Sequence, residues 1–281
     1  MTSPATTPAL AATTRLRATH LTVSDLDRSL GFYQDAIGLR VHAHEDGVAR
    51  LGAGGEDVLA LHEDVAARPA GRHAGLYHVA LLYPSREELA FAVDRLVRTR
   101  TPVEGMSDHQ THEAIYLPDP DGNGLELAAD RPRSAWPAGL GYSGGPAPLD
   151  VEGLYSLARG AEVPRFVGPG FKTGHLHLHV SDLAAARDFY RDVIGFEVQF
   201  EMPTAAFLSA GGYHHHIAVN TWRGPGVPPV PGGGVAGMRH WTVVVTPEDL
   251  AAVAERAGAA PAGGALELPD PSGNVIRLEA S

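Results

Sequence analysis

The chain has 281 residues, a formal net charge of −11 and 44% hydrophobic residues, and its length allows one large or two medium globular domains. The negative charge and the absence of any Lys/Arg run argue against nucleic acid or an anionic membrane surface as a partner. The chain has no cysteine, which excludes disulfides, thiolate metal sites and a cysteine nucleophile, whereas its 15 histidines can serve as metal ligands.

The first segments predict a tail, a strand and a helix. Residues 1–13 lack the basic start and apolar core of a signal peptide, so we expect a flexible tail. No apolar run could span a membrane, and we expect a cytoplasmic protein. The alternating residues 19–23 predict a strand. Ser24 is expected to cap the next helix together with Asp27, and Gly38 to end it.

A second unit of similar plan follows. Residues 76–83 predict a strand, Ser85 with Glu88 predicts the start of a helix, and residues 113–127 predict two strands around an Asp-Pro/Gly-Asn turn. The Pro- and Gly-rich residues 132–170 predict a linker with one short helix near residues 150–158.

The second half of the chain repeats the first. The motif Ser-Asp-Leu recurs at 24–26 and 181–183, and residues 117–127 resemble residues 268–278. We therefore predict two similar domains, 14–131 and 171–281, each made of two units with the order strand, helix, strands.

Four βαβββ units in one chain resemble the vicinal oxygen chelate superfamily, which includes glyoxalase I, bleomycin resistance proteins and extradiol ring-cleaving dioxygenases. The resemblance covers residues 14–131 and 171–281 but not the linker 132–170. It implies an α+β fold of tandem domains, whose units combine to form curled mixed β-sheets around a cavity that holds a metal.

The family's metal ligands occupy recurring positions: a His on the first strand of each of two units, and a Glu near the end of one unit. In this sequence the middle two units supply His78, Glu126 and His175. The outer two units supply Ala18, His240 and Arg277, a poor set for a cation. Two imidazoles and one carboxylate are the ligands of non-heme Fe(II) enzymes, so we expect Fe(II), for which Mn(II) can substitute. Zn(II) or Ni(II) would suit a glyoxalase better.

The units can pair in two ways. Pairing within each half would leave two broken sites, whereas pairing across the halves gives one complete site and one that lacks ligands. We favour pairing across the halves, because random divergence would rarely leave three complementary ligands. Pairing within degenerate halves is the alternative.

Residues 107–127 resemble the extradiol dioxygenase signature, and the whole chain most resembles the two-domain catechol-2,3-dioxygenases of bacteria. The matching positions are His109, Ile115-Tyr116, Asp119-Pro120, Gly122 and Glu126, whereas Ser107 departs from the pattern. The resemblance implies that Tyr116 hydrogen-bonds a substrate oxygen beside the metal and that His109 lines the pocket. The implied reaction is cleavage of a catechol ring by O₂, beside the two hydroxyls. A packed strand tyrosine is the alternative for Tyr116.

Residues 211–222 contain three consecutive histidines ahead of an apolar strand. Strand alternation predicts that His214 and His216 face the cavity and that His215 faces away. We predict that His216 is the catalytic acid/base, with a polar rim that transfers no proton as the alternative. The residues expected to contact substrate are His109, His177 and His214.

Two other function classes share this fold. A glyoxalase-like lyase or isomerase would need a fourth protein ligand, commonly a Glu on the last strand of the third unit, and residues 214–220 contain no carboxylate. A metal-free antibiotic-binding resistance protein would need an apolar cleft and no intact ligand set. The expected partners are a small aromatic diol and O₂, together with further copies of the chain, since dimers are common in the family.

Overall fold

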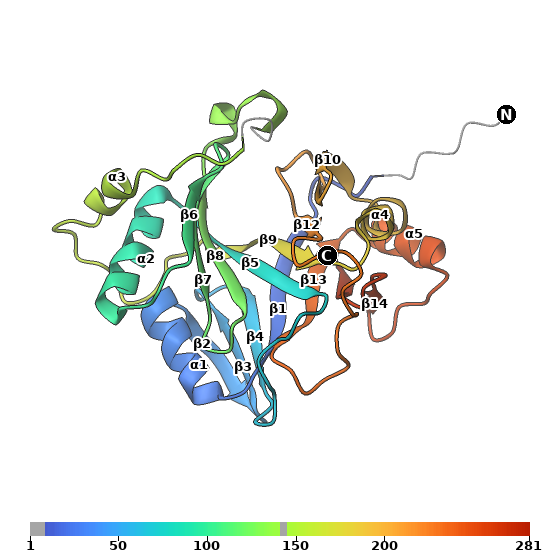
Figure 1. Ribbon diagram of the computed structural model, residues 1–281, viewed down its shortest axis with the longest axis horizontal. Coiled ribbons are helices and arrows are strands. Elements are labelled where there is room, and N and C mark those ends of the chain that lie inside the picture. The colour runs from blue at the N-terminus through green and yellow to red at the C-terminus, as the bar shows by residue number, and fades with distance from the viewer. Residues whose placement is uncertain (1–8, 141–144) are drawn as a thin grey trace.

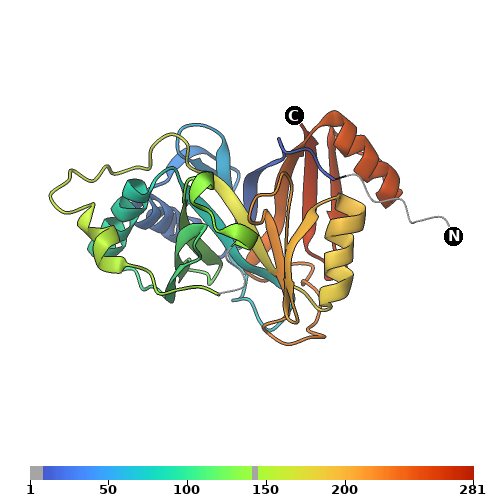
Figure 2. The ribbon, with the colours of Figure 1, turned by 90° about the horizontal axis from the view of Figure 1, so that it is seen from above.

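The computed structural model describes residues 9–140 and 145–281, so residues 1–8 of the predicted tail lie outside it. The protein is built from two curled, mixed β-sheets that lie side by side, with helices at both ends of the molecule (Figures 1 and 2). The predicted α+β fold of four repeated units is confirmed. Among the described residues, no helix has the length and apolar character that a membrane crossing requires.

The first and fourth units together form one sheet, here called the outer-unit sheet. It has seven strands, in the spatial order β14 (Ala265–Pro269), β15 (Val275–Ala280), β13 (Gly237–Val245), β1 (Arg15–Val23), β4 (Asp57–Glu63), β3 (Val48–Gly52) and β2 (Arg40–Glu45). Its centre is the antiparallel pair of β1 and β13.

The second and third units form the other sheet, here called the middle-unit sheet. It has eight strands, in the order β10 (Glu197–Met202), β11 (Ala205–Ser209), β12 (Ile217–Asn220), β9 (Lys172–His179), β5 (Gly75–Tyr83), β8 (Gly124–Asp130), β7 (His112–Pro118) and β6 (Gly105–Asp108). Its centre is the antiparallel pair of β5 and β9. Each sheet therefore takes one unit from each half of the sequence, which confirms the pairing across the halves.

The helices are α1 (Leu26–Phe32) continuing into η1 (Tyr33–Ile37), α2 (Arg86–Thr99), η2 (Arg133–Ala135), α3 (Val151–Ser156), α4 (Leu183–Asp188) continuing into η4 (Phe189–Ile194), and α5 (Pro247–Ala257). Most helices cover the outward faces of the sheets, whereas α3 packs on α2 (Figure 2). The short helix predicted within the linker is α3.

Helix ends follow the predicted signals with one exception. Ser85 caps α2 by accepting from the Glu88 N–H, and Gly38 ends η1 with a φ of 90°. The predicted cap Ser24 is wrong: Asp25 accepts from the Arg28 N–H, because the helix begins one residue later than expected. The Ser24 hydroxyl instead donates to the carboxylate of Asp121 in the second unit.

Two repeated motifs hold the units of each half together. The hydroxyl of the buried Tyr33 donates to Asp119 Oδ2 at 3.0 Å, and that of the buried Tyr190 donates to Asp270 Oδ2 at 3.2 Å. In each half, a helix of one unit is thereby bonded to the Asp-Pro turn of the next. Asp119 and Asp270 therefore have a structural role, as acidic residues in turns commonly do.

The segments outside the repeats also pack onto the sheets. Leu10 is buried and its N–H donates to the Gly195 carbonyl at 2.9 Å, so the tail contacts the third unit from this point on. In the linker, Ala147 forms a bridge with Asp108 on β6. This bridge holds Gly145 and Pro146, the two residues before Ala147, close to the middle-unit sheet.

Candidate metal centre and pocket

The strand register explains why residues from three strands meet. Glu126 on β8 is the neighbour of Ala80 on β5, and Ala80 lies opposite His175 on β9. His78 precedes Ala80 by two residues, so it faces the same side of the sheet. Since Ala80 carries only a methyl group, the side chains of Glu126 and His175 can approach each other above it.

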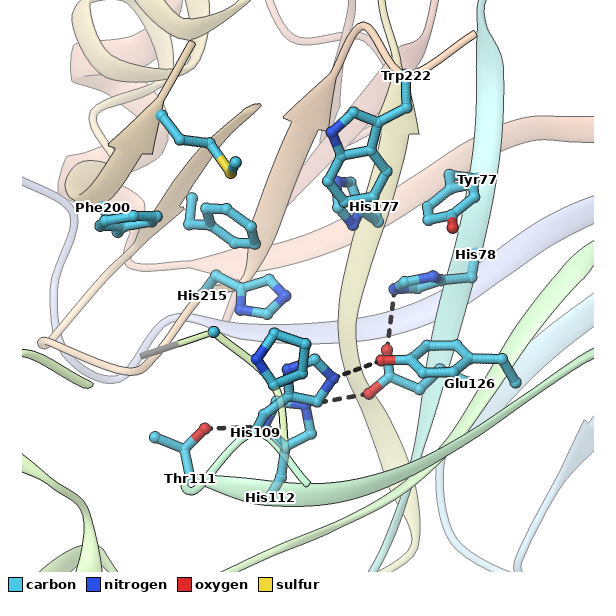
Figure 3. Close-up of a pocket in the computed structure, with 15 residues that line it drawn as sticks. Tyr77, His78, His109, Thr111, His112, Glu126, His177, Phe200, His215 and Trp222 are labelled. Carbon is cyan, nitrogen blue, oxygen red and sulfur yellow. Dashed lines mark hydrogen bonds and ion pairs between the residues drawn. The ribbon is translucent and has the colours of Figure 1, made fainter. Parts of the chain in front are cut away.

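The three predicted ligands come together on one face of the middle-unit sheet, and Figure 3 shows two of them, His78 and Glu126. Glu126 Oε2 lies 2.9 Å from His78 Nε2 and 3.1 Å from His175 Nε2. All three side chains are buried, and the exposed fraction of Glu126 and of His175 is 1%. Glu126 Oε1 lies 3.2 Å from the Nε2 atom of a further histidine, His112.

The donor set fits a divalent transition metal. Although His78 Nε2 and Glu126 Oε1 each lie within ion-pair distance of another group in the cluster, neither of these buried atoms makes a hydrogen bond of good geometry. Burial opposes ionisation of Glu126, but the nearby His175 and His78 outweigh it and hold the pKa of this carboxyl well below its usual range. Burial lowers the pKa of His175. An ionised carboxylate and a neutral imidazole are the forms that bind metals.

Tyr116 and His109 lie beside this cluster. Tyr116 on β7 is the strand neighbour of Glu126, and its hydroxyl oxygen lies 2.7 Å from His109 Nε2. Burial, and then the charge of Glu126, raises the pKa of Tyr116 well above its ordinary value. Burial, and then His112, lowers the pKa of His109 to about 4. Tyr116 is therefore a protonated hydroxyl that can donate to an oxygen placed in the pocket.

A pocket of about 420 Å³ opens above the cluster. Its polar end contains two of the predicted ligands, His78 and Glu126, and also Tyr116 and His109. His177 lines the pocket as well, with its ring 5.2 Å from that of His78 between centroids.

The predicted orientation of the three consecutive histidines is wrong. His215 lines the pocket, whereas His216 does not, and the His216 ring stacks on Phe196 in the core at 6.1 Å. Its Nδ1 accepts from the Ala210 N–H at 3.1 Å, and burial lowers its pKa to about 4. The cause is a bulge: Leu208 lies opposite Ile217 in the ladder, yet its carbonyl accepts from the His216 N–H.

His214 lies behind His215 rather than in the pocket lining. Its Nδ1 lies 2.8 Å from His215 Nδ1, and its Nε2 lies 3.4 Å from Asp130 Oδ1. Its ring stacks on that of His112 at 4.5 Å between centroids. Burial lowers the pKa of His214 well below its ordinary value.

The sequence prediction missed His112, Asp130 and the pocket role of His215. A signal for His112 existed, because it precedes Tyr116 by four residues on one strand and therefore faces the same side. His112 is the strand partner of Asp130, as Tyr116 is of Glu126. No comparable signal existed for His215, since the bulge has no residue pattern of its own here.

The outer-unit sheet holds the corresponding positions without a ligand set. A cavity of about 360 Å³ is lined there by Ala18, His240 and Arg277, among others. The Arg277 guanidinium donates to Glu267 at 2.6 Å and to Glu279 at 2.8 Å, so two carboxylates satisfy its charge. Within residues 9–140 and 145–281, no group of potential metal ligands gathers in this cavity.

Comparisons with known proteins bear on both sheets. A family model described as the Glyoxalase/Bleomycin resistance protein/Dioxygenase superfamily matches residues 15–127 and 172–270. A protein of Bacillus subtilis (strain 168) named catechol-2,3-dioxygenase is 43% identical over 244 residues, which cover 84% of this chain and 85% of that protein.

Two solved structures share the fold. A putative dioxygenase from Bacillus subtilis subsp. subtilis str. 168 has a TM-score of 0.66 at 15% identity, over 98% of this chain and 86% of that one. Glyoxalase I from Zea mays has a TM-score of 0.60 at 17% identity, over 95% and 92% of the two chains. Because these two proteins carry different names on one fold, the structural likeness cannot choose between their activities.

Proposed function

Because the chain belongs to the glyoxalase/bleomycin resistance protein/dioxygenase superfamily, we propose that it is a dioxygenase that opens a catechol ring with O₂, beside the two hydroxyls. The observation that carries the proposal is the cluster of His78, Glu126 and His175, which adjoins the pocket lined by Tyr116 and His109. The relative named catechol-2,3-dioxygenase supports the same reaction class.

We assign Fe(II) as the metal and His78, Glu126 and His175 as its ligands. Two imidazoles and one carboxylate leave positions open on the cation, and Mn(II) is chemically close enough to substitute. When bound, the metal supplies the redox chemistry that lets a catechol react with O₂.

The remaining residues of the pocket bind the substrate and handle its protons. The Tyr116 hydroxyl donates to a substrate oxygen, while His109 Nε2, 2.7 Å away, fixes its direction. The proton lost by the catechol passes to an imidazole of the lining, and we assign this part to His215 because His216 faces the core. His177 forms one wall of the binding site.

Two alternatives are less well supported. A glyoxalase-like lyase would need a further protein ligand, commonly a second carboxylate, and Glu126 is the only carboxylate among the described residues that line the pocket. A metal-free antibiotic-binding protein would leave the ionised Glu126 buried without a cation, which is costly.

The test is anaerobic reconstitution of the purified protein with Fe(II), followed by catechol and air. We expect one iron per chain and a yellow, ring-opened product. His78→Ala should abolish both iron binding and product formation, whereas His240→Ala, at the corresponding position of the outer-unit sheet, should affect neither. Protein that verifiably holds iron yet produces no ring-opened compound would overturn the proposal in favour of the lyase class.

A further inference from the structure

The pocket continues well beyond the polar cluster, and its far part is apolar. Six residues of the lining have apolar or aromatic side chains: Tyr77, Pro146, Phe200, Met202, Phe207 and Trp222. In Figure 3, Phe200 and Trp222 lie on the side of the pocket away from Glu126. A single catechol ring at the polar end would leave this part of the cavity unfilled.

Strand pairing places the apolar part in line with the metal ligands. Phe207 on β11 lies opposite Ala218 on β12, Ala218 is the neighbour of His177 on β9, and His177 lies opposite His78 on β5. One row of side chains thus leads across four strands from Phe207 to a ligand. Because Ala218 carries only a methyl group, the rings of Phe207 and His177 can approach each other above it.

Aromatic rings form a continuous wall along this row. The Phe207 ring lies 5.9 Å from that of Phe200 and 5.7 Å from that of His177. The Trp222 ring lies 4.7 Å from that of His177 and 5.3 Å from that of Tyr77. These centroid distances are typical of packed aromatic pairs. Neighbouring rings are inclined by 42° to 83°, so the wall is an uneven but continuous, largely apolar surface that begins beside the polar end of the pocket.

The pocket has no fixed positive charge to receive an anionic substituent. Among the described residues that line it there is no Lys or Arg, and Glu126 is the only charged group. The nearby Arg131 is held by Asp108 at 2.6 Å, and Arg223 lines a different cavity. A carboxylate placed against the aromatic wall would lose its hydration without gaining a counterion, which is strongly unfavourable.

Building on the proposed function, we infer that the substrate is a catechol with an uncharged apolar substituent, alkyl or aryl, which lies against Phe200, Phe207 and Trp222. Catechols that carry a carboxylate are rejected. Each added methylene buried against the wall is expected to raise the affinity about three- to fourfold, until the cavity is filled.

The inference is tested by binding, separately from turnover. Holoenzyme loaded with Fe(II) is titrated anaerobically, by calorimetry, with catechol, 3- and 4-alkylcatechols and 3,4-dihydroxybenzoate. We expect at least one alkyl series to bind more tightly with chain length, and 3,4-dihydroxybenzoate to bind at least tenfold more weakly than catechol. Equal or tighter binding of the carboxylate, or no gain along either series, would overturn the inference.

Variants tie the preference to the wall. Phe207→Ala should reduce the increase in affinity that each added methylene gives along the alkylcatechol series. Phe200→Arg should supply the missing cation. It should raise the affinity for 3,4-dihydroxybenzoate, relative to the affinity for catechol, at least tenfold. The matched control is Met106→Arg, since Met106 is exposed on β6 and pairs with Ile115, away from the pocket. If Phe200→Arg and Met106→Arg change the binding ratio equally, long-range charge rather than the wall sets the preference.

These outcomes separate the two proposals. Tight, chain-length-dependent binding without ring opening in air would support the inference about the ligand and contradict the proposed reaction. Ring opening of catechol without any preference among the substituents would support the reaction and contradict the inference.

Discussion

At the scale of single residues, the chemistry of the pocket depends on which hydroxyls and imidazoles actually face it. Tyr116 has the geometry of a donor held ready, because its hydroxyl is buried, protonated and 2.7 Å from His109 Nε2. Tyr116→Phe should therefore retain iron and lower kcat about 100-fold, in the range found for loss of one preorganised hydrogen-bond donor. The iron content and kcat of the variant check this, with Tyr155→Phe on the linker helix α3 as control. Unchanged kcat would mean that Tyr116 only packs.

The bulge before β12 gives a second residue-scale prediction. His215→Asn should lower kcat about 100-fold or more, as expected for loss of a proton-transfer group. His216→Asn should mainly lower stability, since His216 packs on Phe196 and accepts from the Ala210 N–H. Steady-state kinetics and thermal unfolding of both variants distinguish these effects. A larger kcat loss in His216→Asn than in His215→Asn would contradict the assignment.

The sequence could predict single residues where a motif fixes their offset, and failed where the backbone departs from a regular strand. His78, Glu126 and His175 were predicted from the positions of the ligands in the family that the sequence resembles, and the structure places both imidazoles within 3.1 Å of Glu126 Oε2. His215 and His216 exchange their expected sides because one bulged residue reverses the alternation, and several residue types are compatible with such a bulge.

At the scale of elements, the metal centre depends on the place where β5 lies between β8 and β9. Ala80 occupies this place and is fully buried, with Glu126 beside it on one strand and His175 opposite it on the other. Ala80→Val should force the two ligands apart and lower the affinity for iron at least tenfold, at a stability cost of about 1–3 kcal/mol.

The control for this substitution lies in the other sheet. Ala60 on β4 is a buried alanine beside His20 in the outer-unit sheet, so Ala60→Val adds the same two methyl groups where no ligand set meets. Titration of the metal-free variants with Fe(II), corrected for the fraction of each protein that is unfolded, compares their affinities for iron. Equal iron affinity in both would show that the methyl group at position 80 does not limit the approach of the ligands.

Elements as such were predictable because their signals are local. Ser85, Gly38 and the turn around Gly122 act through the backbone of their own segment, so the sequence places them within a residue or two. The partner of each unit is a long-range choice, and periodicity carries no information about it. Only the complementary ligands and Ala18/Arg277 mismatch pointed to pairing across the halves.

At the scale of the whole molecule, neither half of the sequence completes a sheet by itself, since each central strand pair joins strands of different halves. Residues 1–140 or 145–281 expressed alone should therefore bind no iron. Their co-expression should restore iron binding, because the ligands at 78 and 126 meet the ligand at 175 only in the complex. Circular dichroism and metal analysis of the fragments check this. A single fragment that folds and binds iron would contradict the interlocked arrangement.

Buried neutral histidines predict how stability depends on pH. Burial lowers the pKa of His109 and of His216 to about 4, below the ordinary value of 6.5. Between pH 6.5 and about 4 the unfolded chain binds protons that the folded chain does not, so the free energy of unfolding falls as the pH falls. Each proton bound only by the unfolded chain contributes about 1.4 kcal/mol per pH unit to the slope of the free energy of unfolding. We expect a slope that corresponds to at least two such protons.

Urea unfolding of the metal-free protein at pH 6.5, 6.0 and 5.5 measures this slope. His216→Gln should reduce it by up to one proton, because the substituted side chain cannot titrate. A free energy of unfolding that stays constant over this range would show that the imidazoles are protonated without loss of the native packing.

The position of the ligands on either side of the linker has a further consequence. Residues 78 and 126 precede it and residue 175 follows it, so a bound cation is a removable cross-link between the two parts of the polypeptide. By mass action, such a link adds about 1.4 kcal/mol to the resistance against unfolding for each tenfold rise of free cation above its Kd. Loss of the metal would then lower the stability of the protein as well as its activity, and the temperature of thermal unfolding would rise with the fraction of protein that holds metal.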